Sequence, residues 1–436
     1  LLKLFDERKL VDAIVVDKVI GRAAAAICAA GGARKVVAAV MSRDAKAFLA
    51  SSTNCVTCIA EPDTVERFGA FMSERFLPAA YLLRNVPNVC APVALAPSWN
   101  VALGGGFRWG YWHFHEALKQ TLVRAGVPFD VLRESEQTAS VYSRYGAVVA
   151  PMRNFATRAE REALAAAAEG GTELVLDSHS KLDLTNATVL ADLRNEDRLA
   201  HPPGGKEKMG RPLRAWALAR RDAWRKGMAA WSEEDGDGSY TFAKELDGMR
   251  FVIVVNDTRA DDRGIFGTFC TNDWYRPLCA ARRIRTHLRD AAGLTVTLFN
   301  PTDGNHAVTV GREGVVEGDF APGESKVYCL ASRPPAELSL GLRGEPCVGG
   351  KVELALSLVA KDGSPQRGRQ VVRLRVRRPD GSAADESGLA VLSGGTGSVV
   401  LRFAHDDERG SFFRKWKVEA EDLATGLTAD LSFALK

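Results

Sequence analysis

PSWNVALGGGFRWGYWHFHE, residues 97–116, lies between two segments of different periodicity. Before it, the apolar run 90–96 (CAPVALA) is typical of a short buried strand, and after it apolar residues recur at helical spacing as far as Gly126. Three consecutive glycines, 104–106, allow the backbone between them to turn through positive φ. The stretch therefore predicts a strand, a glycine loop and a helix, as in an α/β layer.

Aromatic and charged side chains crowd the end of this loop, where a strand of an α/β sheet would present its carboxyl edge to a ligand. The candidate ligand-binding residues are Arg108, Trp109, Trp112, His113, His115 and Glu116. One hypothesis is a polar ligand, such as a sugar, that stacks on the rings and hydrogen-bonds to the charged groups. The alternative, which we favour because large rings usually serve packing, is that the rings are buried against a neighbouring domain. A phosphate loop is not expected, since the glycines lack the G-x-G-x-x-G spacing.

The composition bounds the classes of function. With 436 residues the chain has room for three or four domains. A net charge of +4, from 58 basic and 54 acidic residues, gives no reason to expect a nucleic-acid partner. No run reaches the roughly 18 apolar residues of a membrane span. The chain starts on Leu1 rather than Met, so its true N-terminus and its compartment stay open.

The cysteines do not form a recognisable metal or disulfide pattern. Eight in a chain of this length are too few for a disulfide scaffold. Cys55 and Cys58 form a CxxC pair, but no second Cys or His pair follows at zinc-finger spacing. We therefore expect no metal and no cofactor.

The first 60 residues alternate short helices and strands, with strands predicted at 13–17 and 35–41. The run DKVIGRAAA (17–25) and the later SRDA (42–45) resemble domain-of-unknown-function family 1893, bacterial proteins with a cytidine-deaminase-like fold, over roughly residues 1–65. The resemblance implies a pocket around Asp17, Lys18, Gly21 and Ser42 and a cytoplasmic location; the alternative is that Asp17 and Lys18 merely pair at a loop. The zinc signature H-x-E with P-C-x-x-C is absent, so we interpret residues 1–61 as a truncated and inert deaminase-like domain.

Residues 62–88 are predicted to be a helical linker, and residues 89–238 an α/β domain. Strands at 129–132, 147–150 and 173–177 alternate with a helix over 158–169 that Thr157 caps. This alternation predicts a doubly wound parallel sheet of flavodoxin type. For 201–238 we expect a loop, with a helix over 214–231 as the alternative. In this segment, Trp216, Trp224 and Trp231 either line a groove or attach the segment to the rest of the α/β domain.

Three segments of this region, 111–118, 125–132 (AGVPFDVL) and 143–151 (SRYGAVVAP), resemble the amidotransferase-like middle domain of family 42 β-galactosidases. The resemblance implies a domain that sits behind a catalytic barrel and mediates homo-oligomerisation. Amidotransferase chemistry is excluded, because it needs an elbow cysteine and none occurs between Cys90 and Cys270. The neighbours Asp177, Ser178 and His179 cannot form a triad with one another, and G-x-S-x-G is missing.

Beyond residue 239 the pattern becomes all β. Residues 239–332 predict a small β sandwich, a Pro-Pro linker follows, and residues 336–436 alternate apolar and polar residues as in a seven-strand immunoglobulin-like sandwich. The last domain resembles macroglobulin-type and invasin-type modules of secreted bacterial proteins, which implies an extracytoplasmic location for residues 62–436. The predicted fold class is thus multidomain, α/β plus all-β.

Three functions are compatible with this organisation. The first is a non-catalytic C-terminal portion of a β-galactosidase-like glycoside hydrolase, with a carbohydrate as a candidate partner, because no eight-fold βα repeat offers the carboxylate pair of a catalytic barrel. The second is a small-molecule enzyme or sensor based on the N-terminal deaminase-like domain, and the third is a protein-interaction module made of the sandwiches. We expect no glycosidase turnover from this chain alone.

Overall fold

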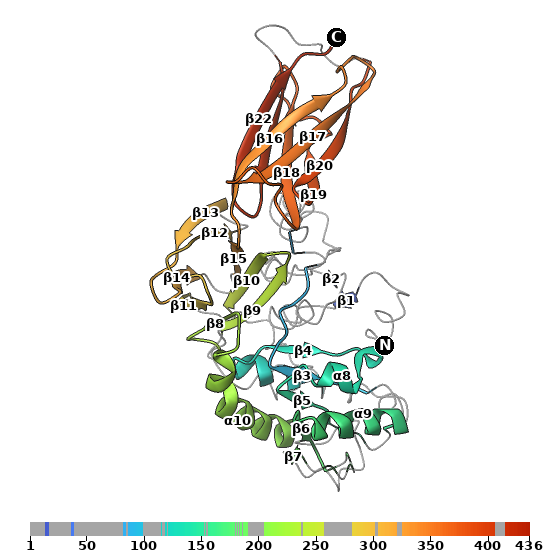
Figure 1. Ribbon diagram of the computed structural model, residues 1–436, viewed down its shortest axis with the longest axis vertical. Helices are drawn as coiled ribbons and strands as arrows, with labels where there is room; N and C mark the ends of the chain where they lie inside the picture. Colours follow the sequence, from blue (N-terminus) through green and yellow to red (C-terminus); the bar gives the residue numbers. More distant parts are fainter. Residues whose placement is uncertain are drawn as a thin grey trace, which may run out of the picture.

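The computed structural model describes about two thirds of the chain. The described residues are 14–16, 36–38, 82–83, 86–98, 115, 118–119, 121–151, 153, 156–178, 180, 182, 184, 186–190, 205–236, 239–256, 281–300, 304–320, 325–405 and 415–436. Within them the fold is mostly β strand with few helices, arranged in several sheets, so the coarse prediction of α/β plus all-β holds. Figure 1 shows the helices gathered at one end, the last strands at the other, and further β structure between. Near the N-terminus, β1 (Ile14–Val16) pairs in parallel with β2 (Val36–Ala38).

A five-stranded sheet forms the core of the α/β part, and every described pair in it is parallel. Its strands are β3 (Val93–Leu95), β4 (Phe129–Val131), β5 (Ala147–Val149), β6 (Glu173–Leu176) and β7 (Ala187–Val189), in the order β4-β3-β5-β6-β7. The central strands β3 and β5 are buried at every residue, as expected of a sheet covered on both faces. The order places β3 between β4 and β5, and the strands predicted at 129–132, 147–150 and 173–177 are confirmed.

Two of the helices show how sequence and packing cooperate. Helix α9 (Arg158–Glu169) begins at a capping box in which Thr157 and Glu160 each satisfy the other's backbone amide, as its sequence predicts. Its Leu164, Ala167 and Ala168 pack into the core cluster of the parallel sheet. A short helix, α8 (Ala139–Tyr142), precedes β5.

The prediction of a loop over 201–238 is wrong, because α10 (Gly205–Arg225) occupies most of it. The buried stripe Met209, Leu213, Trp216 and Ala217 recurs at helical spacing and joins the largest core cluster. Burial of that stripe outweighs the local cost of Pro212 inside the helix. A second tie is polar, since Glu173 at the start of β6 accepts hydrogen bonds from Trp216 Nε1 (2.9 Å) and Arg220 Nη2 (2.7 Å).

Two antiparallel sheets follow the helix. The larger has the order β13-β12-β15-β10-β9 and the smaller the order β14-β11-β8. Their strands are β8 (Ala230–Ser232), β9 (Ser239–Leu246), β10 (Met249–Asn256), β11 (Arg282–Leu288), β12 (Thr295–Asn300), β13 (Gly304–Thr309), β14 (Val315–Phe320) and β15 (Ser325–Ala331). We call these two sheets the central sandwich.

The central sandwich buries both faces of its larger sheet. Val252 and Val254 on β10 pack with Ile284 and Val316 of the smaller sheet. The alternate residues of β10, such as Phe251, lie in the same cluster as the α/β strands and α10. This two-sided burial explains why the run Met249–Asn256 is almost continuously apolar.

The final seven strands form one antiparallel array in the order β16-β17-β20-β19-β18-β21-β22. They are β16 (Pro335–Arg343), β17 (Lys351–Ala360), β18 (Arg369–Arg377), β19 (Gly388–Ser393), β20 (Thr396–Arg402), β21 (Trp416–Asp422) and β22 (Thr428–Phe433). Strands β19 and β20 share only the pair Ser393 and Thr396, so two halves fold over a common core that holds Trp416. The predicted number of strands is confirmed, and we call this part the C-terminal sandwich.

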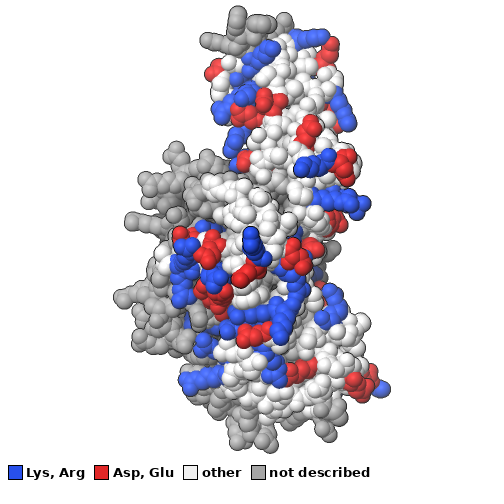
Figure 2. Space-filling model, turned by 60° about the vertical axis from the view of Figure 1, so that its left-hand side comes forward, with Lys and Arg blue, Asp and Glu red and all other residues white. Residues whose placement is uncertain are grey.

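On β18, Arg373 and Arg377 form ion pairs with Glu421 and Glu419 of β21. Figure 2 shows Lys and Arg interspersed with Asp and Glu on the face it presents. Among the residues the structure describes, no helix has both the length and the apolar character needed to cross a membrane.

Candidate functional site

The carboxyl edge of the parallel sheet is the place where a doubly wound fold would bind a ligand. Because β3 lies between β4 and β5, the chain leaves β3 toward one side of the sheet and later enters β5 on the other. The loops after these two strands diverge, and such switch points are the usual ligand sites of the fold class. Ala96 and Ser98 follow β3, Gln137 follows β4, and Arg153 follows β5.

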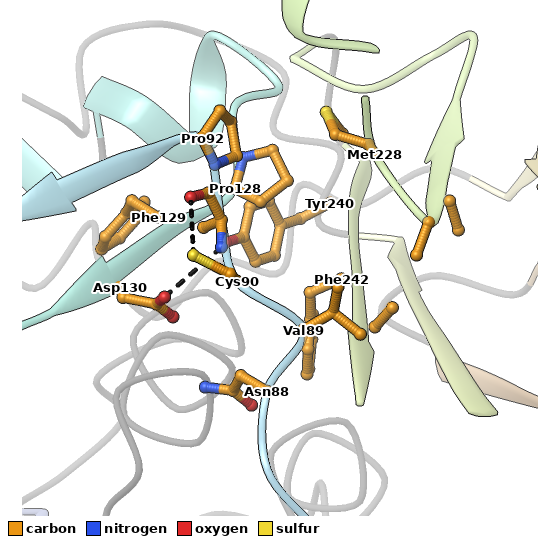
Figure 3. Close-up of a pocket in the computed structure, with 14 residues that line it drawn as sticks. Asn88, Val89, Cys90, Pro92, Pro128, Phe129, Asp130, Met228, Tyr240 and Phe242 are labelled. Carbon is orange, nitrogen blue, oxygen red and sulfur yellow. Dashed lines mark hydrogen bonds between the residues drawn. The ribbon is translucent and has the colours of Figure 1, made fainter. Parts of the chain in front are cut away.

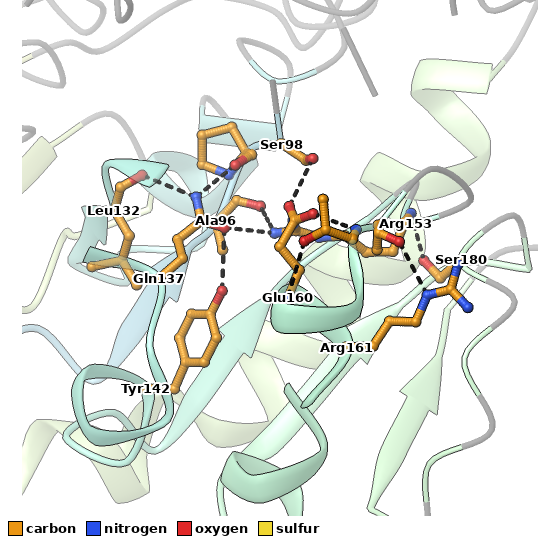
Figure 4. Close-up of polar contacts among 12 residues, drawn as sticks. Ala96, Ser98, Leu132, Gln137, Tyr142, Arg153, Glu160, Arg161 and Ser180 are labelled. Atoms are coloured by element: carbon orange, nitrogen blue, oxygen red, sulfur yellow. Dashed lines mark hydrogen bonds and ion pairs between the residues drawn. The ribbon is translucent and has the colours of Figure 1, made fainter. Parts of the chain in front are cut away.

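The side chain of Arg153 lies buried at this edge of the sheet. Its side chain is fully buried, and its guanidinium donates from Nη1 to Glu160 Oε1 at 3.0 Å. Nη2 donates to the Ala96 carbonyl at 2.5 Å and to Gln137 Oε1 at 3.1 Å. Figure 4 shows these groups converging on one another from three separate segments. The cation is thereby held by the loops that follow three different strands.

The partners of Arg153 are themselves satisfied. Ser98 Oγ donates to Glu160 Oε1 at 3.0 Å, and Gln137 Nε2 donates to the Pro97 carbonyl at 2.6 Å. The Tyr142 hydroxyl donates to Gln137 Oε1 at 3.2 Å, and burial raises the pKa of Tyr142 to about 12, which keeps it a neutral donor. We call Ser98, Gln137, Tyr142, Arg153 and Glu160 the edge network. It closes the switch point with side chains whose charges compensate one another.

The sequence predicted a site at this edge, but it did not predict that Arg153 and its partners occupy the edge. Of the loop 97–116 the structure describes Pro97, Ser98 and His115, and His115 lies in a helix with 1% of its surface exposed. Arg108, Trp109, Trp112, His113 and Glu116 lie outside the described residues, so their role as ligand-binding residues stays a prediction. Two signals for the network were present in the sequence: an arginine two residues after Pro151, which follows a predicted buried strand, and a Thr-x-x-Glu capping box.

A small cavity lies at the joint between the α/β part and the central sandwich. It is lined by 88–92, by 128–130 at the start of β4, by 228–230 and by residues of β9, and water-sized molecules can reach about 30 Å³ of it (Figure 3). That volume holds roughly two waters. The cavity is therefore too small for a sugar ring.

Burial shifts the pKa values of the polar groups at this cavity, in the direction that disfavours their charged forms. Asp130 Oδ2 accepts hydrogen bonds from the Tyr145 hydroxyl (3.1 Å) and the Ala91 amide (3.4 Å), yet burial raises the pKa of Asp130. Cys90 is exposed, but partial burial of its thiol, and secondarily the Asp130 carboxylate, raises the pKa of that thiol, which lowers its thiolate fraction. Nearby, Lys244 donates to the Val86 carbonyl at 3.1 Å, and burial lowers its pKa to about 8.

The tryptophans of the 201–238 segment anchor α10 and the strand after it, which decides against a groove. Trp216 meets Trp224 edge to face at 5.4 Å. The Trp231 ring stacks on His287 at 3.8 Å, and the Arg225 guanidinium lies over the same ring at 4.4 Å. The Trp231 ring is thus packed against side chains of α10 and β11, which is the packing role rather than the groove.

The predicted N-terminal pocket cannot be placed, because Asp17, Lys18, Gly21 and Ser42 lie outside the described residues, as do Cys55 and Cys58. Within the part of the chain that is described, no three His, Cys, Asp or Glu side chains gather as they would around a metal ion.

Comparison with known proteins supports the N-terminal resemblance over a short range. The family model of the domain of unknown function DUF1893 matches residues 1–57. No curated protein matches the chain. The match covers less than half of the chain.

Solved structures similar to the chain include β-galactosidases. A catalytic mutant of Gan42B, a GH42 β-galactosidase from G. stearothermophilus, is 11% identical, with 56% of this chain and 41% of that chain covered and a TM-score of 0.31. The cold-adapted β-galactosidase from Rahnella sp. R3 is 13% identical over 91% of this chain and 61% of that chain, with a TM-score of 0.29. The α-2-macroglobulin of E. coli is 14% identical over 44% of this chain and 14% of that chain, with a TM-score of 0.19. The chain thus spans less than two thirds of each relative, at scores too low to establish a shared fold.

Proposed function

We propose that residues 62–436 are a non-catalytic structural portion of a β-galactosidase-like glycoside hydrolase, serving scaffolding and oligomerisation in carbohydrate metabolism. In this proposal the chain is divided at the boundaries predicted from sequence, with a helical linker over 62–88, an amidotransferase-like α/β domain over 89–238, and sandwiches over 239–332 and 336–436. The deaminase-like domain over 1–61 precedes them.

The observation that carries the proposal is the edge network. A doubly wound domain that binds or transforms a ligand keeps its switch point open, whereas here Arg153 and Glu160 occupy it as a buried ion pair with side-chain exposures of 0% and 8%. Breaking a buried pair to admit a ligand would leave an uncompensated charge, which costs several kcal/mol. The arrangement favours a structural role for this domain over ligand binding at its switch point.

Glycosidase chemistry points the same way. It requires two carboxyl groups about 5–10 Å apart across a cleft that admits a sugar. Glu160 is committed to Arg153 and Ser98, and Asp130 borders a cavity of about 30 Å³. Within the described residues the carboxylates near these two places serve the fold.

Hydrolysis of p-nitrophenyl β-galactoside by the purified chain tests the proposal. We expect a rate equal to that of buffer, together with self-association that sedimentation velocity detects as a concentration-dependent mass. Saturable turnover that follows the protein through successive purification steps would overturn the non-catalytic assignment. A monomer at all concentrations would overturn the oligomerisation role alone.

The DUF1893 match supports a second candidate, a small-molecule enzyme or sensor carried by the N-terminal domain. Its test is a difference in ligand binding between the full chain and the variant Lys18→Ala, measured by thermal shift against a nucleoside panel. A shift seen in the parent and lost in the variant would favour this candidate.

A further inference from the structure

The small cavity at the joint has walls from two parts of the molecule. Phe129 and Asp130 lie on β4 of the α/β part, whereas Tyr240 and Phe242 lie on β9 of the central sandwich. Much of the lining is apolar, but Asp130 and Tyr240 contribute one polar side chain from each part. Figure 3 shows both side chains at the cavity, with Tyr240 extending from β9. A molecule held between these two groups would therefore connect the two parts.

The Tyr240 hydroxyl is a buried donor without an acceptor. Tyr240 has 2% of its surface exposed, and its hydroxyl makes no hydrogen bond within the described chain. Burial, and secondarily the Asp130 carboxylate, raises the pKa of Tyr240, so the hydroxyl keeps its proton. The Phe129 backbone amide opposes this rise in pKa, but an amide N–H can only donate and does not accept that proton. Native structures satisfy most buried hydroxyls of this kind with protein groups or ordered water.

Asp130 offers an acceptor from the other part of the molecule. Its hydrogen bonds from the Tyr145 hydroxyl (3.1 Å) and the Ala91 amide (3.4 Å) both go to Oδ2, so Oδ1 makes none within the described chain. The Tyr240 hydroxyl does not reach Asp130 directly, although both residues line the same cavity. A molecule that accepts from Tyr240 and donates to Asp130 Oδ1 would satisfy both groups.

The size of the cavity and the charges around it select that molecule. Water-sized molecules can reach about 30 Å³ of the cavity, which holds roughly two waters. A cavity of this size that carries polar groups holds water, whereas a purely apolar one stays dry. A cation is disfavoured, because Arg144 and Lys244 already place positive charge near Asp130.

We propose that an ordered water bridges the Tyr240 hydroxyl and Asp130 Oδ1, so that bound water completes the joint between the central sandwich and the α/β part. The water accepts from Tyr240 Oη and donates to Asp130 Oδ1. The remaining volume admits a second water, which supplies the first with a further hydrogen-bond partner. The bridge connects the two parts whichever function the chain serves.

A crystal structure of the full chain tests the bridge. We expect density for a water about 2.5–3.0 Å from both Tyr240 Oη and Asp130 Oδ1, and we expect that density to be lost in Tyr240→Phe. Crystals soaked in rubidium chloride distinguish water from a cation, because bound rubidium gives an anomalous peak and water does not. A cavity without density, or an anomalous peak between the two groups, would overturn the proposal.

Urea unfolding gives an independent test in solution, with Tyr142→Phe as the matched control. The Tyr142 hydroxyl is also buried, but it donates directly to Gln137 Oε1 at 3.2 Å. If water satisfies the Tyr240 hydroxyl, Tyr240→Phe resembles the control, and we expect each variant to lower the folding equilibrium constant about three- to tenfold. An unchanged or higher constant in Tyr240→Phe would contradict the bridge, because removal of an unsatisfied hydroxyl does not destabilise the fold. If Tyr240→Phe does not fold, the crystal structure of the parent chain decides.

Discussion

Replacing Arg153 by methionine tests the edge network at its centre. The variant keeps an unbranched apolar stem but removes the cation that Glu160, Ala96 and Gln137 share. Hydrogen bonds to charged groups contribute about 1.5–3 kcal/mol each and are not additive, and breaking a buried ion pair costs about 3–5 kcal/mol. We therefore expect Arg153→Met to lower the free energy of unfolding of the α/β part by about 3–5 kcal/mol.

The assay is urea unfolding followed at 222 nm, because α9 and α10, the longest described helices, belong to this part of the molecule. Arg158→Met is the matched control, since Arg158 also pairs with a glutamate, Glu162, but both side chains are exposed, at 91% and 62%. The control should change stability by no more than about 0.5 kcal/mol. The double variant Arg153→Met, Glu160→Gln should recover part of the loss, because no buried carboxylate is left unpaired. A loss below about 1 kcal/mol in Arg153→Met would refute the reasoning, since it would mean that the pair is not a fixed part of the core.

Three further predictions concern the cap, the joint and a buried amine. Thr157→Ala should cost about 1 kcal/mol in urea unfolding, because it removes half of the α9 capping box; an unchanged midpoint would contradict that role. Gly126→Ala should lower the free energy of unfolding several times more than Gly171→Ala in the same assay. Both glycines have positive φ, but a Cβ at Gly126 would lie 2.6 Å from the Asp235 backbone, whereas the space beside Gly171 is open. Lys244→Met should raise the free energy of unfolding at pH 7 by about 1–3 kcal/mol and lose most of that gain near pH 10. The lysine has a folded pKa of about 8 and an unfolded pKa of about 10.4, so it destabilises the fold increasingly as pH falls between these two values. Equal effects of the substitution at both pH values would count against it.

Much of the fold could be predicted because its signals are local. The strands and the helix of the α/β part follow from apolar runs, glycines and a capping threonine, and β17 shows the strict alternation of a half-buried strand. For the segment of helix α10 a loop was preferred and a helix over 214–231 was the alternative, because the polar composition and Pro212 obscured the four buried residues spaced along one face. The helix forms because its apolar face packs against the rest of the protein, and that packing is not visible in the sequence.

The sequence predicted where a candidate site would lie, but not which side chains occupy it. The carboxyl edge of a parallel sheet follows from strand order, so the sequence predicts a site in the loop after β3; of that loop the structure describes residues 97, 98 and 115. Two of the hydrogen bonds that close the edge join residues far apart in the sequence: Ser98 and Glu160 are 62 residues apart, and Ala96 and Arg153 are 57 residues apart. Such long-range pairing has no periodic signature. The same holds for Asp130 and Tyr240, which come from different parts of the molecule and line one cavity.

Hydrogen exchange at the carboxyl edge of the parallel sheet tests the central claim most directly. Peptides that cover residues 94–98 and 151–160 should exchange slowly, with opening free energies near that of global unfolding, since the edge network packs them together. Saturating galactose or lactose should leave their exchange unchanged. Fast exchange that either sugar slows would show that the edge is an open ligand site and would contradict the account.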